Sequence, residues 1–152
     1  MRFTKQMTID VPRQVVWDFL WDVPRLSRCI PGCEKAEVVE PYRRYQATVA
    51  ERVGPFRVKV PLAIEIREAT PPVQLRAQAS GKDTTVQSLV KVGLDLTLVE
   101  VTPQVTALQF TVDVSVLGKL GTLGHSIIVR KGDEIIAQFA EAIQAELHKG
   151  VC

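Results

Sequence analysis

The segment FRVKVPLAIEIR, residues 56–67, decides the fold, because apolar and polar residues alternate along its length. Side chains along a β-strand point alternately to the two faces of the sheet. One face of this strand carries Phe56, Val58, Val60, Leu62, Ile64 and Ile66. The other face carries Arg57, Lys59, Glu65 and Arg67, with Pro61 and Ala63 between them. The pattern predicts a long strand with one buried face and one face in water.

The same alternation recurs between residues 34 and 118. Its apolar positions are Val73, Leu75, Ala77 and Ala79, then Leu94, Leu96 and Leu98, then Leu108, Phe110, Val112, Val114 and Val116. Turns are predicted at 40–43, 53–55, 80–83 and 102–104, since each of these short segments contains Gly or Pro. Alternating segments joined by short turns predict an antiparallel meander in which consecutive strands are neighbours.

The residues before this meander predict one strand and two short helices. Residues 3–9 alternate as a first strand, and Asp10 is expected to cap a helix that has Pro12 in its first turn. The apolar side of this helix is Val15, Val16, Phe19 and Leu20. A second helix is expected from about Pro24 to Cys29, because the residue before Pro31 avoids the helical region.

After Gly118 the apolar period becomes helical. The stripe consists of Leu120, Leu123, Ile127, Ile135, Phe139, Ile143 and Leu147. A helix of ~26 residues would be about 40 Å long, which matches a strand of ~12 residues. We expect Gly118, Gly121 and Gly124 to allow close packing at its start, and Gly132 to mark a bend.

These elements predict an α+β fold in which a curved antiparallel sheet wraps around a long C-terminal helix, with two short helices after the first strand. The length of 152 residues suits one domain, spanning 1–152. A hydrophobic fraction of 46% and a charged fraction of 24% are typical of a packed globular chain. The net charge of +2 comes from scattered basic residues, so no nucleic-acid partner is expected.

The first ten residues lack the apolar core of a signal peptide, and no uncharged apolar run has the ~18 residues of a membrane span. We therefore expect a cytoplasmic protein whose membrane contact, if there is one, is peripheral. The three cysteines, Cys29, Cys33 and Cys152, predict no disulfide framework.

Metal and cofactor sites are not expected. Cys29 and Cys33 are four residues apart, which is neither the spacing of a redox dithiol nor that of a zinc ligand pair. His125 and His148 lie 23 residues apart on one expected helix, so they do not converge on one ion. The favoured interpretation of the cysteines is that they are small buried side chains beside a turn, and the alternative is a thiol switch.

A catalytic site would need a nucleophile, a base and an orienting group brought together. A set formed by Cys29 or Cys33 with His125 and Asp113 fails on the pattern, because Asp113 is expected to face solvent. The carboxylates of Glu51, Glu65 and Glu68 fall at exposed positions or turns. The sequence therefore predicts no catalytic residue.

The inward faces of the strands carry more apolar side chains than one helix stripe covers. We therefore expect an elongated, mostly apolar cavity between the strands and the terminal helix, in or near the range of about 300–1,000 Å³ for small-molecule pockets. Its predicted wall is Phe56, Val58, Val60, Leu62, Ile64, Leu94, Leu96, Leu98, Phe110, Val112, Val114, Ile127, Ile135 and Phe139.

A family resemblance refines this interpretation. In VWDFLWDVPRLSRCIPGCE, residues 16–34, a helix is followed by Leu26 and by a Cys-x-Pro-Gly-Cys turn made by Cys29, Pro31, Gly32 and Cys33. This stretch resembles the CoxG-type proteins, the CoxG subunits of carbon monoxide dehydrogenase, as do VGPFRVKV at 53–60 and VSVLGKLGTLG at 114–124. The order of elements is also similar to the helix-grip arrangement of the START and Bet v 1 (SRPBCC) superfamily. The chain ends at Cys152, directly after the expected helix, without the membrane-seeking tail that some members carry.

The resemblance implies a protein that accompanies a molybdenum hydroxylase of the carbon monoxide dehydrogenase type and takes part in its association with the membrane. It also implies a superfamily that binds lipids, sterols or quinone-like molecules. Together with the apolar pattern, this predicts a non-enzymatic carrier of a quinone- or lipid-like molecule, cytoplasmic or peripheral at the inner face of the membrane. The alternatives are a cyclase or dehydratase of the same superfamily, which needs a buried polar pair, and an interaction module with a filled core.

Overall fold

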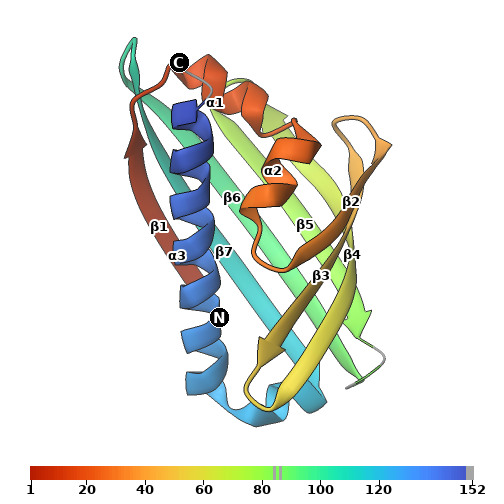
Figure 1. Cartoon of the computed structure of the whole chain (residues 1–152). Coiled ribbons are helices and arrows are strands. Elements are labelled where there is room, and N and C mark those ends of the chain that lie inside the picture. The colour runs from red at the N-terminus through yellow and green to blue at the C-terminus, as the bar shows by residue number, and fades with distance from the viewer. Residues whose placement is uncertain (84, 86, 150–152) are drawn as a thin grey trace.

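Seven strands pair in one antiparallel sheet, in the order β1-β7-β6-β5-β4-β3-β2, and a long helix crosses its inner face (Figure 1). The computed structural model describes residues 1–83, 85 and 87–149. The strands are β1 (Arg2–Ile9), β2 (Cys33–Glu40), β3 (Arg44–Val53), β4 (Phe56–Thr70), β5 (Gln74–Asp83), β6 (Ser88–Thr102) and β7 (Val105–Gly118). The helices are α1 (Arg13–Phe19), α2 (Val23–Cys29), a 3₁₀ helix η1 (Lys119–Leu123) and α3 (His125–Lys149). The expected helix-grip fold is confirmed.

Three of the four predicted turns are confirmed and one is wrong. Strand β5 continues through Asp83, so residues 80–83 do not form a turn. Gly81 is needed inside the strand, because a Cβ there would collide with the carbonyl oxygen of Pro61 in β4. The buried Asp83 carboxylate accepts the N–H of Lys59 at 2.7 Å and that of Thr85 at 2.6 Å. Gly81 therefore serves strand packing, whereas Asp83 connects β4 to the segment that follows β5.

The two short helices follow the prediction except at their first cap. Pro12, with extended φ and ψ of −61° and 149°, occupies the position before α1, which has no side-chain cap. The prediction that Asp10 caps this helix is wrong, because the extended Pro12 delays the first helical residue to Arg13. In α2, the Asp22 carboxylate accepts the N–H of Arg25 at 3.3 Å. The helix ends at Cys29, as predicted, because Ile30 has an extended backbone before Pro31.

The C-terminal stripe is divided between two helices. Leu120 and Leu123 belong to η1, and α3 begins only at His125. Gly118 and Gly124 flank η1 with φ of 91° and 97°, a backbone conformation that other residues rarely adopt. The 25 residues of α3 span about 37 Å. The expected long helix is therefore preceded by a separate short turn of helix.

The middle of α3 lies close to the edge strand β1. A Cβ added at Gly132 would lie within about 2.7 Å of the Phe3 ring, which projects from β1 toward the helix. At the C-terminal half of α3, Gln144 Nε2 donates to the carbonyl of Thr8 at 3.2 Å. Gly132 lies within continuous α3, and its visible role is to make room for an aromatic ring.

Substitution of Gly132 by alanine tests this contact. An exposed helical Gly→Ala change stabilises by up to about 1 kcal/mol, but overpacking against Phe3 costs about 1–3 kcal/mol. We expect Gly132→Ala to lower the free energy of unfolding, measured by urea denaturation. In a Phe3→Ala background the same substitution should instead be stabilising. A stabilising effect in the native background would contradict the assigned contact.

Candidate functional site

The inner face of the sheet is built from rows of side chains that lie opposite one another on neighbouring strands. Antiparallel partners point to the same face. Phe110 of β7 pairs with Leu96 of β6, and its ring lies 6.0 Å from that of Phe139 in α3. The rows that contain Phe110 and its alternate neighbours therefore face α3. All strand residues of the predicted cavity wall lie on this inner face.

Two packed clusters occupy the two ends of this inner face. The upper cluster joins α1, α2 and the C-terminal part of α3 to the sheet, and includes Trp17, Phe19, Leu98, Phe110 and Ile143. The lower cluster joins η1 to the β3–β4 hairpin, and its buried members are Val53, Val58, Val60 and Leu120. Each cluster seals one end of the space between helix and sheet.

A row of five residues between the clusters belongs to neither of them. This row, which we call the middle row, consists of Tyr45, Ile64, Ala79, Val92 and Val114 on five successive strands. All five are partly exposed although they lie on the inner face. Apolar side chains in this position gain stability when an apolar ligand removes them from water.

The predicted wall residues divide according to these clusters. Leu96, Leu98 and Phe110 are buried in the upper cluster, against which Leu94, Val112 and Phe139 pack. Val58 and Val60 are buried in the lower cluster, against which Phe56 and Leu62 pack. Ile64 and Val114 lie in the middle row, Ile135 is partly exposed and Ile127 is 37% exposed. Sequence reasoning missed Val92, although Val90 and Val92 extend the alternation that begins at Leu94.

A partly buried ion pair also faces the interior. Glu51 lies opposite Val58, and its Oε2 is 2.9 Å from Lys131 Nζ of α3, with both side chains 21% exposed. The expectation that Glu51 is at an exposed position or turn is wrong, because β3 continues through it to Val53. The hydrogen bond to Glu51 raises the pKa of the Lys131 ammonium.

The Cys-x-Pro-Gly-Cys turn packs against the same carboxylate. Gly32 has φ of 77°, and its carbonyl accepts the N–H of Ala50 at 2.8 Å. A Cβ there would collide with the carbonyl oxygen of Ala50 and would also crowd the Glu51 side chain. Glycine is therefore required at this turn for both backbone conformation and close approach. Through Glu51, the turn is connected to Lys131 of α3.

Four aromatic rings form a second group, between the end of α1 and the β2–β3 hairpin. The Trp21 ring lies 5.8 Å from Trp17, 4.8 Å from Tyr42 and 6.4 Å from Tyr45, measured between centroids. Trp21 Nε1 is fully enclosed and has no hydrogen-bond partner among the described residues. An enclosed N–H without an acceptor costs about 1–3 kcal/mol.

The catalytic set considered from the sequence is not assembled. Cys29 is buried, and its Sγ lies 3.6 Å from the carbonyl oxygen of Arg25. Burial is the main cause of a raised pKa for this thiol, and the negative charge of Glu146 raises it further. A raised pKa disfavours the reactive thiolate. Asp113 lies on the outer face, where Arg2 Nε is 3.0 Å from its Oδ1. His125 is exposed at the start of α3.

Metal ligands and further cysteines add no site to the described part of the chain. Among residues 1–83, 85 and 87–149, no three His, Cys, Asp or Glu side chains are grouped to hold a metal ion. Cys29 and Cys33 are free thiols. Cys152 lies outside the described residues, as does the side chain of His148.

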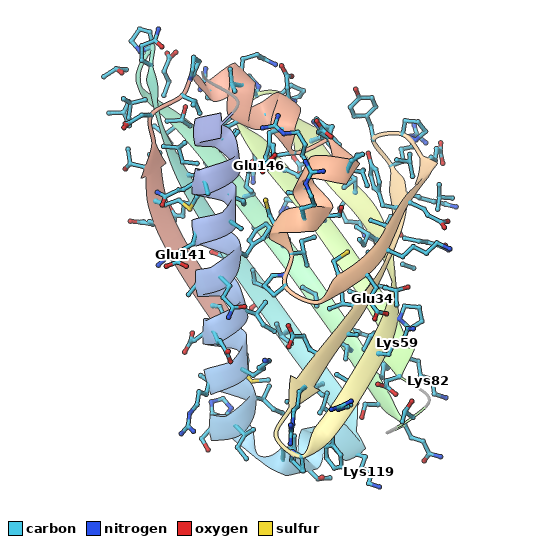
Figure 2. The ribbon with its side chains drawn as sticks, viewed as in Figure 1. Glu34, Lys59, Lys82, Lys119, Glu141 and Glu146 are labelled. Atoms are coloured by element: carbon cyan, nitrogen blue, oxygen red, sulfur yellow. The ribbon has the colours of Figure 1, made fainter. Side chains whose placement is uncertain are left out.

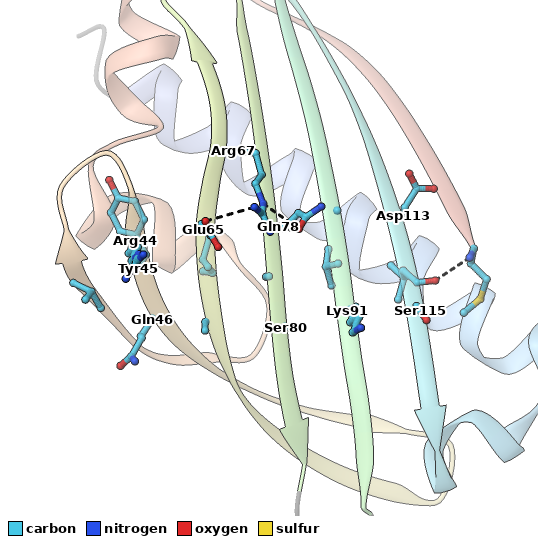
Figure 3. Close-up of a pocket in the computed structure, with 18 residues that line it drawn as sticks. Arg44, Tyr45, Gln46, Glu65, Arg67, Gln78, Ser80, Lys91, Asp113 and Ser115 are labelled. Atoms are coloured by element: carbon cyan, nitrogen blue, oxygen red, sulfur yellow. Dashed lines mark hydrogen bonds and ion pairs between the residues drawn. The ribbon is translucent and has the colours of Figure 1, made fainter.

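A hollow of about 1080 Å³ lies on the outer face of the sheet, away from α3 (Figure 3). Small residues, including Ala63, Ser80, Gly93 and Ser115, form its floor. Charged and amide side chains surround it, and Arg67 there donates to Gln78 at 2.8 Å. The strands of the middle row also line it, through Tyr45, Ile64, Ala79, Val92 and Val114. No described residue of α3 does so, and this hollow is therefore not the expected cavity between sheet and helix.

The upper end of α3 is held to α2 by ionic contacts. Arg25 Nε lies 3.1 Å from the Glu146 carboxylate, and its Nη2 donates to the Glu146 carbonyl at 3.0 Å. Arg28 Nη2 lies 3.4 Å from the same carboxylate. The pKa of the Glu146 carboxyl lies below its usual value. The hydrogen bond from Arg25 is the main cause, and Arg28 adds to it. Figure 2 shows Glu146 on the α2 side of the helix and Glu141 on the β1 side.

Comparison with known proteins gives these features a context. The family model of CoxG, a subunit of carbon monoxide dehydrogenase, matches residues 6–148. The chain belongs to the CoxG family. No curated protein matches the sequence. None of the described helices is long and apolar enough to cross a membrane.

Solved structures share the fold of this CoxG-family chain. A conserved protein from Geobacillus kaustophilus is 23% identical, with 98% of this chain and 96% of that one covered and a TM-score of 0.87. A START superfamily protein from Mycobacterium smegmatis is 12% identical, with 97% of each chain covered and a TM-score of 0.76. The Zhui aromatase/cyclase of a Streptomyces species is 14% identical, with 100% and 96% covered and a TM-score of 0.77. These likenesses confirm the START and Bet v 1-like fold.

The contact between α2 and α3 generates a pH prediction. A lowered carboxyl pKa stabilises the fold above the unfolded value of about 4.3, and this stability is lost as the pH falls through the folded value. Glu146→Gln should therefore lower the melting temperature at pH 7, and the difference should shrink between pH 5 and pH 3. Glu141→Gln is the matched control on the same helix, because Glu141 makes no ion pair with the described residues. Equal effects of the two substitutions at pH 7 would contradict the prediction.

Proposed function

We propose that this chain is a non-enzymatic binding protein that holds a quinone- or lipid-like molecule between the sheet and α3. CoxG-family membership and the helix-grip fold support a ligand-binding protein. The observation that carries the proposal is the middle row, in which five inward-facing side chains are partly exposed between two packed clusters. Four of the five are aliphatic, so the chemistry suits an apolar ligand.

The position of α3 supports this assignment. Its backbone lies against β1 on one side and β3 on the other, as well as against α2 and η1. Contacts at both sides allow the helix to bridge the curved sheet above the middle row. A ligand that lies along the row would bury apolar area at about 25 cal/mol per Å².

The Glu51–Lys131 pair is the feature that a cyclase or dehydratase interpretation would use. Acid–base catalysis at neutral pH works best with a group whose pKa is near 7. The pKa of Lys131 is raised, so its ammonium is retained at neutral pH and it is a poor general base. The pair is therefore better suited to hold α3 against β3, and we favour binding over catalysis.

The proposal extends to a partner enzyme. By family, the chain would serve as an accessory or membrane-recruitment factor for a molybdenum hydroxylase of the carbon monoxide dehydrogenase type, in the cytoplasm or peripherally at the inner face of the membrane. The test is gel filtration of the purified chain with the purified hydroxylase, with and without vesicles. Co-elution with the hydroxylase would support the role, and separate elution at micromolar concentrations would contradict it.

A charge placed in the middle row tests the ligand site. Val114→Asp should reduce binding of a short-chain quinone at least tenfold, because a carboxylate is costly beside apolar ligand atoms. Ser115→Asp is the matched control, since the next residue of β7 faces the opposite side of the sheet. Binding is measured by fluorescence quenching, and thermal melts establish that each variant is folded.

Native mass spectrometry with organic extraction of the purified chain gives an independent measurement. A co-purifying apolar molecule, lost from Val114→Asp but retained by Ser115→Asp, is the expected result. Equal binding by a folded Val114→Asp variant would contradict the site. A native chain that binds neither extracted nor added apolar molecules would instead support an interaction module.

A further inference from the structure

The enclosed indole N–H of Trp21 is a donor that the fold leaves unused. Nearly all enclosed polar groups in native proteins have a hydrogen-bond partner, so each exception calls for an explanation. Trp21 packs against the upper cluster, yet its Nε1 has no acceptor among the described residues. A partner that arrives with a ligand would explain this donor.

The aromatic group around Trp21 adjoins the middle row. Tyr45, whose ring lies 6.4 Å from that of Trp21, is also the first residue of the row and lies opposite Ile64. A ligand that extends along the row from Val114 toward Tyr45 would therefore end near Trp21. The middle row and the aromatic group that encloses the donor are therefore adjacent.

Tyr42 forms the outer side of this aromatic group. Its ring lies edge-on to Trp21 at 4.8 Å, while 62% of the residue is exposed. Tyr42 also lines an open hollow of about 480 Å³ at the β2–β3 hairpin. The ring therefore stands between Trp21 and solvent.

The backbone at Tyr42 has an uncommon conformation that glycine would adopt more readily. Its φ is 66°, which is uncommon for a residue with a side chain and costs free energy relative to extended backbone. Its N–H donates to the Tyr45 hydroxyl at 2.8 Å, which holds the turn in this conformation. The turn is also closed by the N–H of Arg43, which donates to the Glu40 carbonyl at 3.0 Å, so the hydroxyl bond is one of two that fix the backbone on which the Tyr42 ring is carried.

We propose that Trp21 Nε1–H is a ligand-binding donor, covered here by Tyr42, and that the ligand has a flat ring bearing a carbonyl acceptor. The inference rests on the proposed function and selects between its two ligand types. Three aromatic side chains next to the donor favour a ring, which they contact by stacking or edge-to-face packing. A carbonyl on that ring would accept the N–H, whereas a hydrocarbon chain would leave it unpaired.

Matched probes separate the hydrogen bond from apolar burial. The probes are 2,3-dimethyl-1,4-naphthoquinone and 2,3-dimethylnaphthalene, which share the ring and differ in the two carbonyls, with 1-dodecanol as a chain-like third probe. Equilibrium dialysis measures the affinity of each probe for the native chain, Trp21→Phe and Trp17→Phe. Trp17→Phe is the matched control, because it also removes one indole from the same aromatic group.

We expect the native chain to bind the quinone about tenfold more tightly than the hydrocarbon. This preference should disappear in Trp21→Phe and remain in Trp17→Phe, while the affinity for the hydrocarbon changes little. Tyr42→Gly should accelerate association of both ring probes, measured by stopped-flow quenching of tryptophan fluorescence, because glycine accepts the positive φ and removes the covering ring. An unchanged association rate would contradict the covering role of Tyr42. Thermal melts identify any variant that fails to fold, and Tyr42→Gly then provides the independent test.

Other outcomes overturn the proposal in distinguishable ways. Equal native affinity for the two ring probes, or a preference that survives in Trp21→Phe, would remove Trp21 as the donor while the ligand site remains. Binding of 1-dodecanol without either ring probe would exclude a ring ligand and leave the proposed carrier function intact. No binding of any probe would overturn the inference and the proposed function together.

Discussion

The structure depends on two contacts that hold α3 against both sides of the curved sheet. Both contacts are made by adjacent residues of the helix. Lys131 reaches β3 through Glu51, and the adjacent Gly132 accepts the Phe3 ring of β1. Because β1 is one edge of the sheet and β3 lies next to the other, these neighbouring residues connect its two sides. The helix therefore bridges the sheet, and the strands between these contacts curve beneath it.

This arrangement explains why apolar side chains are buried at the ends and partly exposed between them. At the upper end, α1 and α2 add Trp17, Phe19 and Cys29 to the packing. At the lower end, Leu120 of η1 packs on the β3–β4 hairpin. The middle row has neither of these additional layers above it. An antiparallel sheet covered by one helix needs such end pieces, because a single helix stripe is narrower than the sheet.

The polar groups near the interior have distinct structural roles. Glu51 and Lys131 neutralise each other, and Gly32 of the Cys-x-Pro-Gly-Cys turn packs on the Glu51 side chain. This turn therefore supports the residue that holds α3 to β3. Its glycine has a clear physical requirement, whereas the thiol of Cys29 is a buried side chain with a raised pKa. The geometry thus favours a structural role for this turn over thiol chemistry.

Much of the fold could be predicted from the sequence because its determinants are local. Alternation over residues 56–67 and 108–116 assigned the inner and outer faces of β4 and β7, and Pro31 ended α2 where expected. The predictions were wrong where one residue type occurs in more than one kind of local structure, as Gly and Asp do in turns, caps and strands. Gly81 resembled a turn residue but allows close packing on β4, and Asp83 is the last residue of β5 rather than part of a turn at 80–83. Asp10 resembled a helix cap, but Pro12 occupies the cap position.

The site was predicted less completely for a different physical reason. Periodicity alone determined that Val58, Leu96 and Val114 share the inner face, because side-chain direction follows from the strand itself. Only the tertiary structure decided that Val58 and Leu96 are packed core while Val114 is partly exposed, since this depends on where distant helices end. The inward position of Glu51 and the unused donor of Trp21 likewise arise from contacts between segments that are far apart in the chain. The sequence by itself determined which face each side chain takes, and tertiary packing decided which of them are left for a ligand.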